Sequence, residues 1–138
     1  MTGFDDLKNS LQHDIELHER LRDILRIESV SIEDNSIMHI PDTISKKTDI
    51  EHEIESTSRE VNLLMEQYYR IAVHLDRETR NDIGCLVKRL HETIRETIAA
   101  VGDTIAAVRR SKQGMVRNIS EMNTKQTAIT AYLRSRAG

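Results

Sequence analysis

The sequence predicts an all-α protein: an elongated antiparallel three-helix bundle or coiled coil whose long C-terminal helix, about residues 82–134, extends beyond the other two. An apolar row at alternating steps of three and four runs from Ile83 to Leu133, the pattern of a helix that buries one narrow seam against other helices. Aromatic residues make up only 3% of the chain, so the core must be aliphatic, which suits a bundle. Five Gly and one Pro leave few turns, which favours a few long elements.

This row is the feature around which the chain is organised. Its positions are Ile83, Val87, Leu90, Ile94, Ile98, Val101, Ile105, Val108, Lys112, Met115, Ile119, Met122, Gln126, Ile129 and Leu133. Only Lys112 and Gln126 interrupt it. At 1.5 Å per residue, a helix over about 53 residues forms a rod of about 80 Å. That rod is longer than the rest of the chain can cover.

The first helix is predicted over about residues 3–32. Acidic residues near its start suit a helix N-terminus. The polar residues that follow Val30 compete for the backbone and end the helix. Its apolar face is Phe4, Leu7, Leu11, Ile15 and Leu21 or Leu25, and His18 interrupts it.

The second helix is predicted over about residues 42–75, because Pro41 is tolerated only in the first turn of a helix. Its apolar face is Ile44, Ile50, Ile54, Val61, Leu64 or Met65, Tyr68, Ile71 and Leu75. Polar residues 76–80 predict a tight turn, and Thr79-x-x-Asp82 resembles a capping box for the third helix. The chain is therefore expected to form a single helical domain over residues 1–138.

The helix lengths predict an uncovered tail over residues 114–138. A second helix of about 34 residues, antiparallel to the third, reaches only to about Met115. The apolar residues beyond that point are predicted to bind a partner. They are Met115, Ile119, Met122, Ile129, Tyr132 and Leu133. Three arrangements would satisfy them: a bend at Gly102 or Gly114, pairing of two chains in a homodimer, or an amphipathic helix from a client.

The net charge of −3 conceals a basic C-terminal part, with seven bases from Arg109 onward against one acid, Glu121. Nucleic acid, an acidic membrane surface or an acidic partner would each suit such a segment. Helix C-termini also favour cations, and the tail has one Tyr and no aromatic stacking platform. We therefore predict no binding of nucleic acid.

The sequence predicts neither an enzyme nor a cofactor. The six His residues lack metal-ligand spacing, and the acidic residues of positions 49–55 are interpreted as a solvated face. No Gly-rich phosphate loop is present, and Cys85 is the only cysteine. Without a basic and apolar leader or an apolar run long enough to span a bilayer, the sequence predicts a cytoplasmic protein with no transmembrane segment.

Four segments resemble the FlgN-type flagellar export chaperones. They are Leu17-x-x-x-Leu21-x-x-x-Leu25-x-x-Glu28-Ser29, Ile44-x-x-Lys47-x-x-Ile50-x-x-x-Ile54, the stretch from Val108 to Ile119, and Tyr132 followed by the terminal Gly138. The order of features, three long helices with a Leu-rich first helix ending in a Glu, is also similar to that family.

This resemblance implies a cytoplasmic chaperone that binds flagellar hook–filament junction proteins before type III export. The partners would be such secreted clients, together with components of the export apparatus. In the family the C-terminal helix recognises the client, which here corresponds to the tail left uncovered by the length argument. The alternative prediction is a homodimeric structural or signalling protein that uses the helical bundle for protein interaction.

Overall fold

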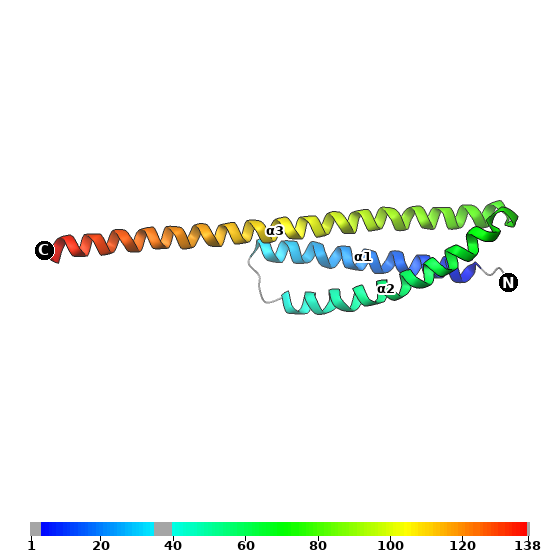
Figure 1. Ribbon diagram of the computed structural model, residues 1–138, viewed down its shortest axis with the longest axis horizontal. Helices are drawn as coiled ribbons and strands as arrows, with labels where there is room; N and C mark the ends of the chain where they lie inside the picture. The colour runs from blue at the N-terminus through cyan, green and yellow to red at the C-terminus, as the bar shows by residue number, and fades with distance from the viewer. Residues whose placement is uncertain (1–3, 35–39, 138) are drawn as a thin grey trace.

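The computed structural model describes residues 4–34 and 40–137, all of which belong to helices or to the turns beside them. Helix α1 spans Asp5–Glu33, α2 spans Ile40–Ile71, the short 3-10 helix η2 spans Ala72–His74, and α3 spans Arg77–Ala137. Figure 1 shows α3 running past the end of the other two helices. The predicted all-α class with a long C-terminal helix is confirmed. Residues 1–3, 35–39 and 138 of the predicted domain lie outside the described residues.

Helix α1 lies parallel to α3. Four ion pairs join residues whose numbers rise together along the two helices. They are Lys8–Asp82, Glu19–Arg89, Arg22–Glu96 and Glu33–Arg110. These pairs are largely exposed, so they set the register of the two helices more than they stabilise the fold.

Helix α2 lies antiparallel to α1. Ser58 Oγ is 3.5 Å from Asp14 Oδ2, and Lys47 Nζ donates to Glu28 Oε1 at 3.0 Å, so residue numbers fall on one helix as they rise on the other. Helix α1 packs against both α2 and α3, whereas α2 and α3 approach each other only sparsely. In Figure 1, α1 lies between α3 and the N-terminal part of α2.

The core has two parts. The larger part lies toward the α2–α3 turn and contains the buried side chains Phe4, Leu7, Leu11, Ile15, Val61, Tyr68, Ile83 and Leu90. The ring of Phe4 meets that of Tyr68 edge to face, with centroids 5.6 Å apart. The smaller part consists of Leu21, Leu25 and Ala100, with Ile50 and Ile54 packed against them. The predicted apolar face of the first helix is therefore buried.

Helix α3 begins at Arg77, five residues before the predicted start. The capping residue is Asp76, not Thr79. The Thr79 amide donates to Asp76 Oδ2 at 3.3 Å, and the Thr79 hydroxyl donates to Asp76 Oδ1 at 2.6 Å. These bonds hold the pKa of Asp76 below its ordinary value. Asp76 accepts from the backbone N–H three residues later and is therefore a strong N-cap by itself. The capping-box interpretation overlooked this residue.

Helix α3 is one uninterrupted element through Gly102 and Gly114. The chain therefore does not fold its tail back onto its own bundle, which removes the first of the three arrangements that the sequence left open. A Cβ at either glycine would meet no atom within 4 Å, so neither glycine marks a close approach of another helix.

A candidate interaction surface on the long helix

The seam by which α3 contacts α1 consists of small residues. Its buried positions are Thr93, Thr97, Ala100, Thr104 and Ala107. They repeat at steps of four and three, as a coiled-coil seam does. Small side chains let two helices approach closely, and α1 lies directly over this stripe.

The threonine hydroxyls of this seam are satisfied by backbone carbonyls. Thr97 Oγ1 lies 3.2 Å from the His18 carbonyl oxygen of α1 and 2.9 Å from that of Thr93. Thr104 Oγ1 lies 3.2 Å from the Leu25 carbonyl oxygen and 3.1 Å from that of Ala100. Buried hydroxyls without such partners would be costly, so these contacts explain why threonine is tolerated here.

The predicted seam is wrong for the middle of α3, because burial there is shifted by one residue. Ile83 and Leu90 are buried, but the row beyond Ile94 is exposed. The exposed fractions are 65% for Ile98, 41% for Val101, 48% for Ile105 and 48% for Val108.

This exposed row continues the side of α3 that packs with α2 near the turn. Leu90 and Ile94 belong to the core that α3 shares with α2, and positions 98, 101, 105 and 108 continue from them at helical spacing. Helix α2 shares buried side chains with α3 near the turn, and further along α1 lies between the two helices (Figure 1). The row thus loses its cover within the bundle, about 17 residues before the tail begins.

The tail is uncovered, as the helix lengths predicted. Helix α1 ends at Glu33, where Ile32 and Glu33 line a hollow together with Gly114 and Met115 of α3. Beyond this hollow every residue from 115 to 135 whose side chain is described is exposed. The predicted partner-binding residues are exposed by more than half: Met115 57%, Ile119 58%, Met122 69%, Ile129 59%, Tyr132 60% and Leu133 59%.

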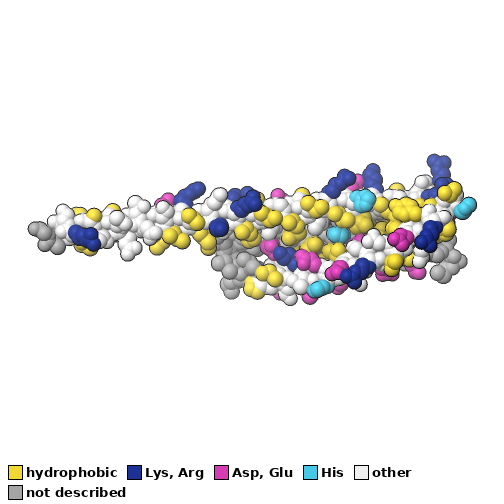
Figure 2. Space-filling model, in the orientation of Figure 1, with side chains coloured by type: hydrophobic (Ala, Val, Ile, Leu, Met, Phe, Trp, Pro, Cys, Tyr) yellow, Lys and Arg dark blue, Asp and Glu magenta, His cyan; other side chains and the backbone are white. Residues whose placement is uncertain are grey.

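Exposed apolar side chains therefore recur along α3 from the bundle into the tail, as separate patches in Figure 2. We call this series the exposed row and define it as Ile98, Val101, Ile105, Val108, Met115, Ile119, Met122, Ile129 and Leu133. Tyr132 lies beside it, and Lys112 and Gln126 occupy the two polar positions within it. A row of exposed apolar side chains of this length is typical of a site for another protein.

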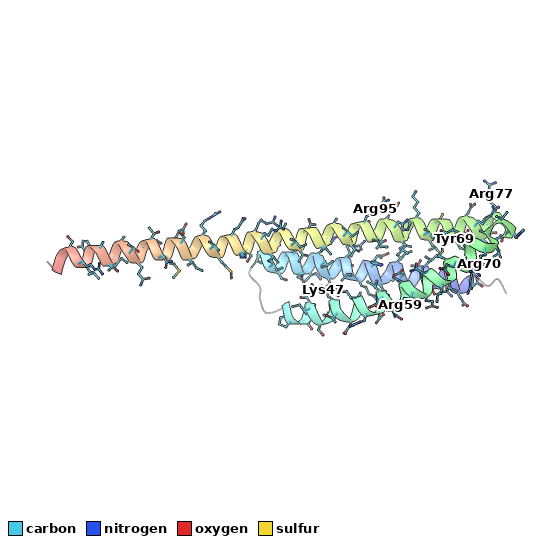
Figure 3. The ribbon with its side chains drawn as sticks, in the orientation of Figure 1. Lys47, Arg59, Tyr69, Arg70, Arg77 and Arg95 are labelled. Carbon is cyan, nitrogen blue, oxygen red and sulfur yellow. The ribbon has the colours of Figure 1, made fainter. Side chains whose placement is uncertain are left out.

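Two buried polar contacts tie α2 to α1. Glu28 is 6% exposed and its Oε2 lies 2.9 Å from Lys47 Nζ. Lys47 extends from α2 toward α1 (Figure 3). The sequence analysis singled out both residues in the family resemblance but did not predict that they pair. The sequence did carry a signal for this pair. A Glu lies within the apolar repeat of one helix, and a Lys lies within that of the adjacent antiparallel helix.

The second contact joins Asp14 of α1, which is 2% exposed, to Ser58 of α2, whose Oγ lies 3.5 Å from Asp14 Oδ2. His18 Nε2 lies 3.5 Å from Asp14 Oδ1, on the same helix. Burial raises the pKa of Asp14, although His18, Ser58 and His13 act to lower it. Burial also lowers the pKa of His18, against the pull of Asp14. The sequence analysis took His18 as an interruption of the apolar face and did not single out Asp14.

The other candidate residues lie apart from the exposed row. Cys85 is exposed with a free thiol, and Asp49, Glu51, Glu53 and Glu55 are exposed on α2. In the part of the chain that the structure describes, no three His, Cys, Asp or Glu side chains are placed to hold a metal ion.

The comparisons with known proteins identify no relative: no family model, no curated protein and no solved structure matches the chain. Among the helices over residues 4–34 and 40–137, none is long and apolar enough to cross a membrane.

Proposed function

We propose that this protein is a cytoplasmic chaperone that binds flagellar hook–filament junction proteins before their type III export, with the tail as the client-binding surface. The observation that carries the proposal is the exposure of the row beyond Gly114 on a helix that no other part of the described chain covers. The client-binding residues are Met115, Ile119, Met122, Ile129, Tyr132 and Leu133.

The proposed mechanism is burial of a client's amphipathic helix along the tail. Side chains at steps of three and four present one face, which is how helix-in-groove recognition reads its target. Fully burying five large apolar side chains contributes about 1.5–3 kcal/mol each before ordering costs, and micromolar affinity needs about 8 kcal/mol. The two methionines suit this role because their flexible side chains adapt to partners of different shape.

The family resemblance supports the client class. The Leu-rich end of α1 and the start of α2 carry two of the resembling segments, and Glu28 of one pairs with Lys47 of the other. This ion pair gives Glu28 and Lys47, which belong to two segments that resemble the family, a joint role in holding α1 and α2 together. The same resemblance makes the export apparatus the expected second partner.

Affinity purification from host lysate tests this function. The bait is the full chain, compared with Ile119→Asp/Met122→Asp in the row and with the matched control Thr124→Asp on the opposite side of the tail. We expect a secreted filament-type protein to be retained by the wild type and the control and lost with the double variant. Retention by all three would contradict the tail assignment, and the absence of any secreted flagellar protein would contradict the client class.

A homodimeric structural or signalling protein is the second candidate function. The observation that favours it is that the exposed row does not stop at the tail but continues back to Ile98 in the bundle. A surface needed only for a client has no reason to extend there. A doubled mass without any client, together with no secreted partner in the purification, would favour this candidate.

A further inference from the structure

The exposed row has two halves with four apolar residues each on one uninterrupted helix. The bundle half contains Ile98, Val101, Ile105 and Val108, and the tail half contains Ile119, Met122, Ile129 and Leu133, with Met115 between them. From Ile98 to Leu133 the row is about 52 Å long. A second row running in the opposite direction would match it end to end, with Ile98 of one chain beside Leu133 of the other.

The two halves differ in charge. Residues 1–113 contain 22 acidic and 16 basic residues, whereas the tail, residues 114–138, contains one acidic and four basic residues. The bundle thus has a formal charge of −6 and the tail of +3. In a parallel pair the two basic tails would repel each other. In an antiparallel pair each basic tail lies against the acidic bundle of the other chain, which is favourable.

We propose that two copies of this chain associate antiparallel through α3, so that the tail half of each row packs on the bundle half of the other. The tail cannot reach its own bundle, because α3 is uninterrupted from Arg77 to Ala137. The complementary surface is therefore available only on a second molecule. This inference does not depend on the proposed client, which would compete for the tail.

The arrangement would supply the cover that α2 does not provide. The bundle half continues the side of α3 that packs with α2 near the turn, and further along α1 separates α2 from α3 (Figure 1). A partner tail on this row runs antiparallel to α3 and adds a fourth helix to each end of the dimer. A strip about 52 Å long and about 10 Å wide on each chain gives roughly 1,000 Å² in total, the lower bound for a specific interface.

Light scattering on the purified full chain tests the association. We expect a mass near twice the 15.9 kDa of one chain. Ile105→Asp in the bundle half and Ile119→Asp in the tail half should each weaken the dimer at least tenfold, whereas Thr124→Asp should not. Circular dichroism shows whether each variant keeps its bundle. A wild-type monomer, or a dimer that survives both row variants, would overturn the proposal.

Distances between spin labels test the orientation. Single cysteines at Ala99 and Thr124, introduced in a Cys85→Ser chain, lie off the row. An antiparallel dimer places the two Ala99 positions about 50 Å apart and the two Thr124 positions about 25–30 Å apart. A parallel dimer would give short distances at both sites and would overturn the proposed orientation.

One variant separates this inference from the proposed function. Ile105→Asp leaves the tail half intact, so client capture by this monomeric variant reports on the chaperone function alone. Its mass reports on self-association alone. Either proposal can therefore fail while the other stands.

Discussion

Glu28 and Lys47 form the most buried ion pair between two helices of the described chain, with side-chain exposures of 8% and 22%. We expect Lys47→Met to lower the free energy of unfolding by about 2–3 kcal/mol, because it leaves the Glu28 carboxylate buried without its partner. Replacing both residues, as Glu28→Leu/Lys47→Met, should recover most of this loss. Urea unfolding measures the effect.

Lys46→Met is the matched control for that experiment. Lys46 lies next to Lys47 but is exposed, and its ion pair with Asp42 is exposed too. Its replacement should change the free energy of unfolding by less than about 0.5 kcal/mol. If Lys46→Met and Lys47→Met cost the same, the Glu28–Lys47 pair does not hold α2 on α1.

Asp14 and His18 make stability depend on pH in opposite directions. The pKa of Asp14 is raised by burial above 3.8, so the folded state holds this proton more tightly, and stability from Asp14 falls as pH rises from 3.8 through the raised pKa. The pKa of His18 is lowered by burial below 6.5, so its contribution to stability falls as pH drops from 6.5 through the lowered pKa.

Asp14→Asn should therefore be most favourable at neutral pH. At pH 7 we expect it to be as stable as the wild type or up to about 2 kcal/mol more stable, because it removes a buried charge. Near pH 3.5 the gain should vanish, since the wild-type carboxyl is then protonated. Urea unfolding at several pH values measures this, with exposed Asp23→Asn as control. A variant that loses more stability at pH 7 than at pH 3.5 would contradict the assignment.

At the scale of the helix, Gly102 is an unfavourable residue in the middle of α3. A Cβ there would meet nothing within 4 Å, so alanine fits without strain. We expect Gly102→Ala to raise the free energy of unfolding by about 1 kcal/mol, because glycine has more backbone freedom to lose on folding. Ala99→Gly, at an exposed position nearby on α3, should lower it by a similar amount. Chemical unfolding of both variants checks the sign, and a loss with Gly102→Ala would indicate a hidden contact.

The sequence predicted the helices and their overhang, because apolar periodicity and helix length are local properties. It did not predict which stripe of α3 meets α1. Hydrophobicity favoured Ile98 and Ile105, but the buried positions are Thr97 and Thr104, one residue away. Close approach of two helices selects small side chains, and the divergence of α2 from α3 left the larger ones exposed. Which stripe of α3 is buried depends on how all three helices pack together, and the apolar periodicity of one helix does not encode this.

The candidate site was predictable in part for the same reason. The tail residues followed from counting helix lengths, which needs no knowledge of packing. The bundle half of the row did not follow, because the sequence analysis assigned Ile98 and its neighbours to the core. The buried contacts of Asp14 with Ser58 and of Glu28 with Lys47 depend on the register between α1 and α2. That register is set by the whole bundle.

At the scale of the whole molecule, the proposed dimer predicts that dilution melts the tail. The tail continues a folded helix, so it needs no new nucleus, but Ile119, Thr124, Thr127 and Thr130 have low helix propensity. In the proposed dimer, contact with the second chain holds this segment helical. Residues 115–137 are about a fifth of the α-helical residues of the described chain.

We therefore expect the helical circular dichroism signal to fall by up to about a fifth over the concentrations at which light scattering shows the dimer dissociating. Ile105→Asp, monomeric throughout, should show the lower signal at every concentration, and Thr124→Asp should behave like the wild type. A client segment added to Ile105→Asp should restore the signal, because client and second chain order the same tail. Full helicity in a chain shown to be monomeric would mean that the tail is stable alone, and the need for a covering partner would disappear.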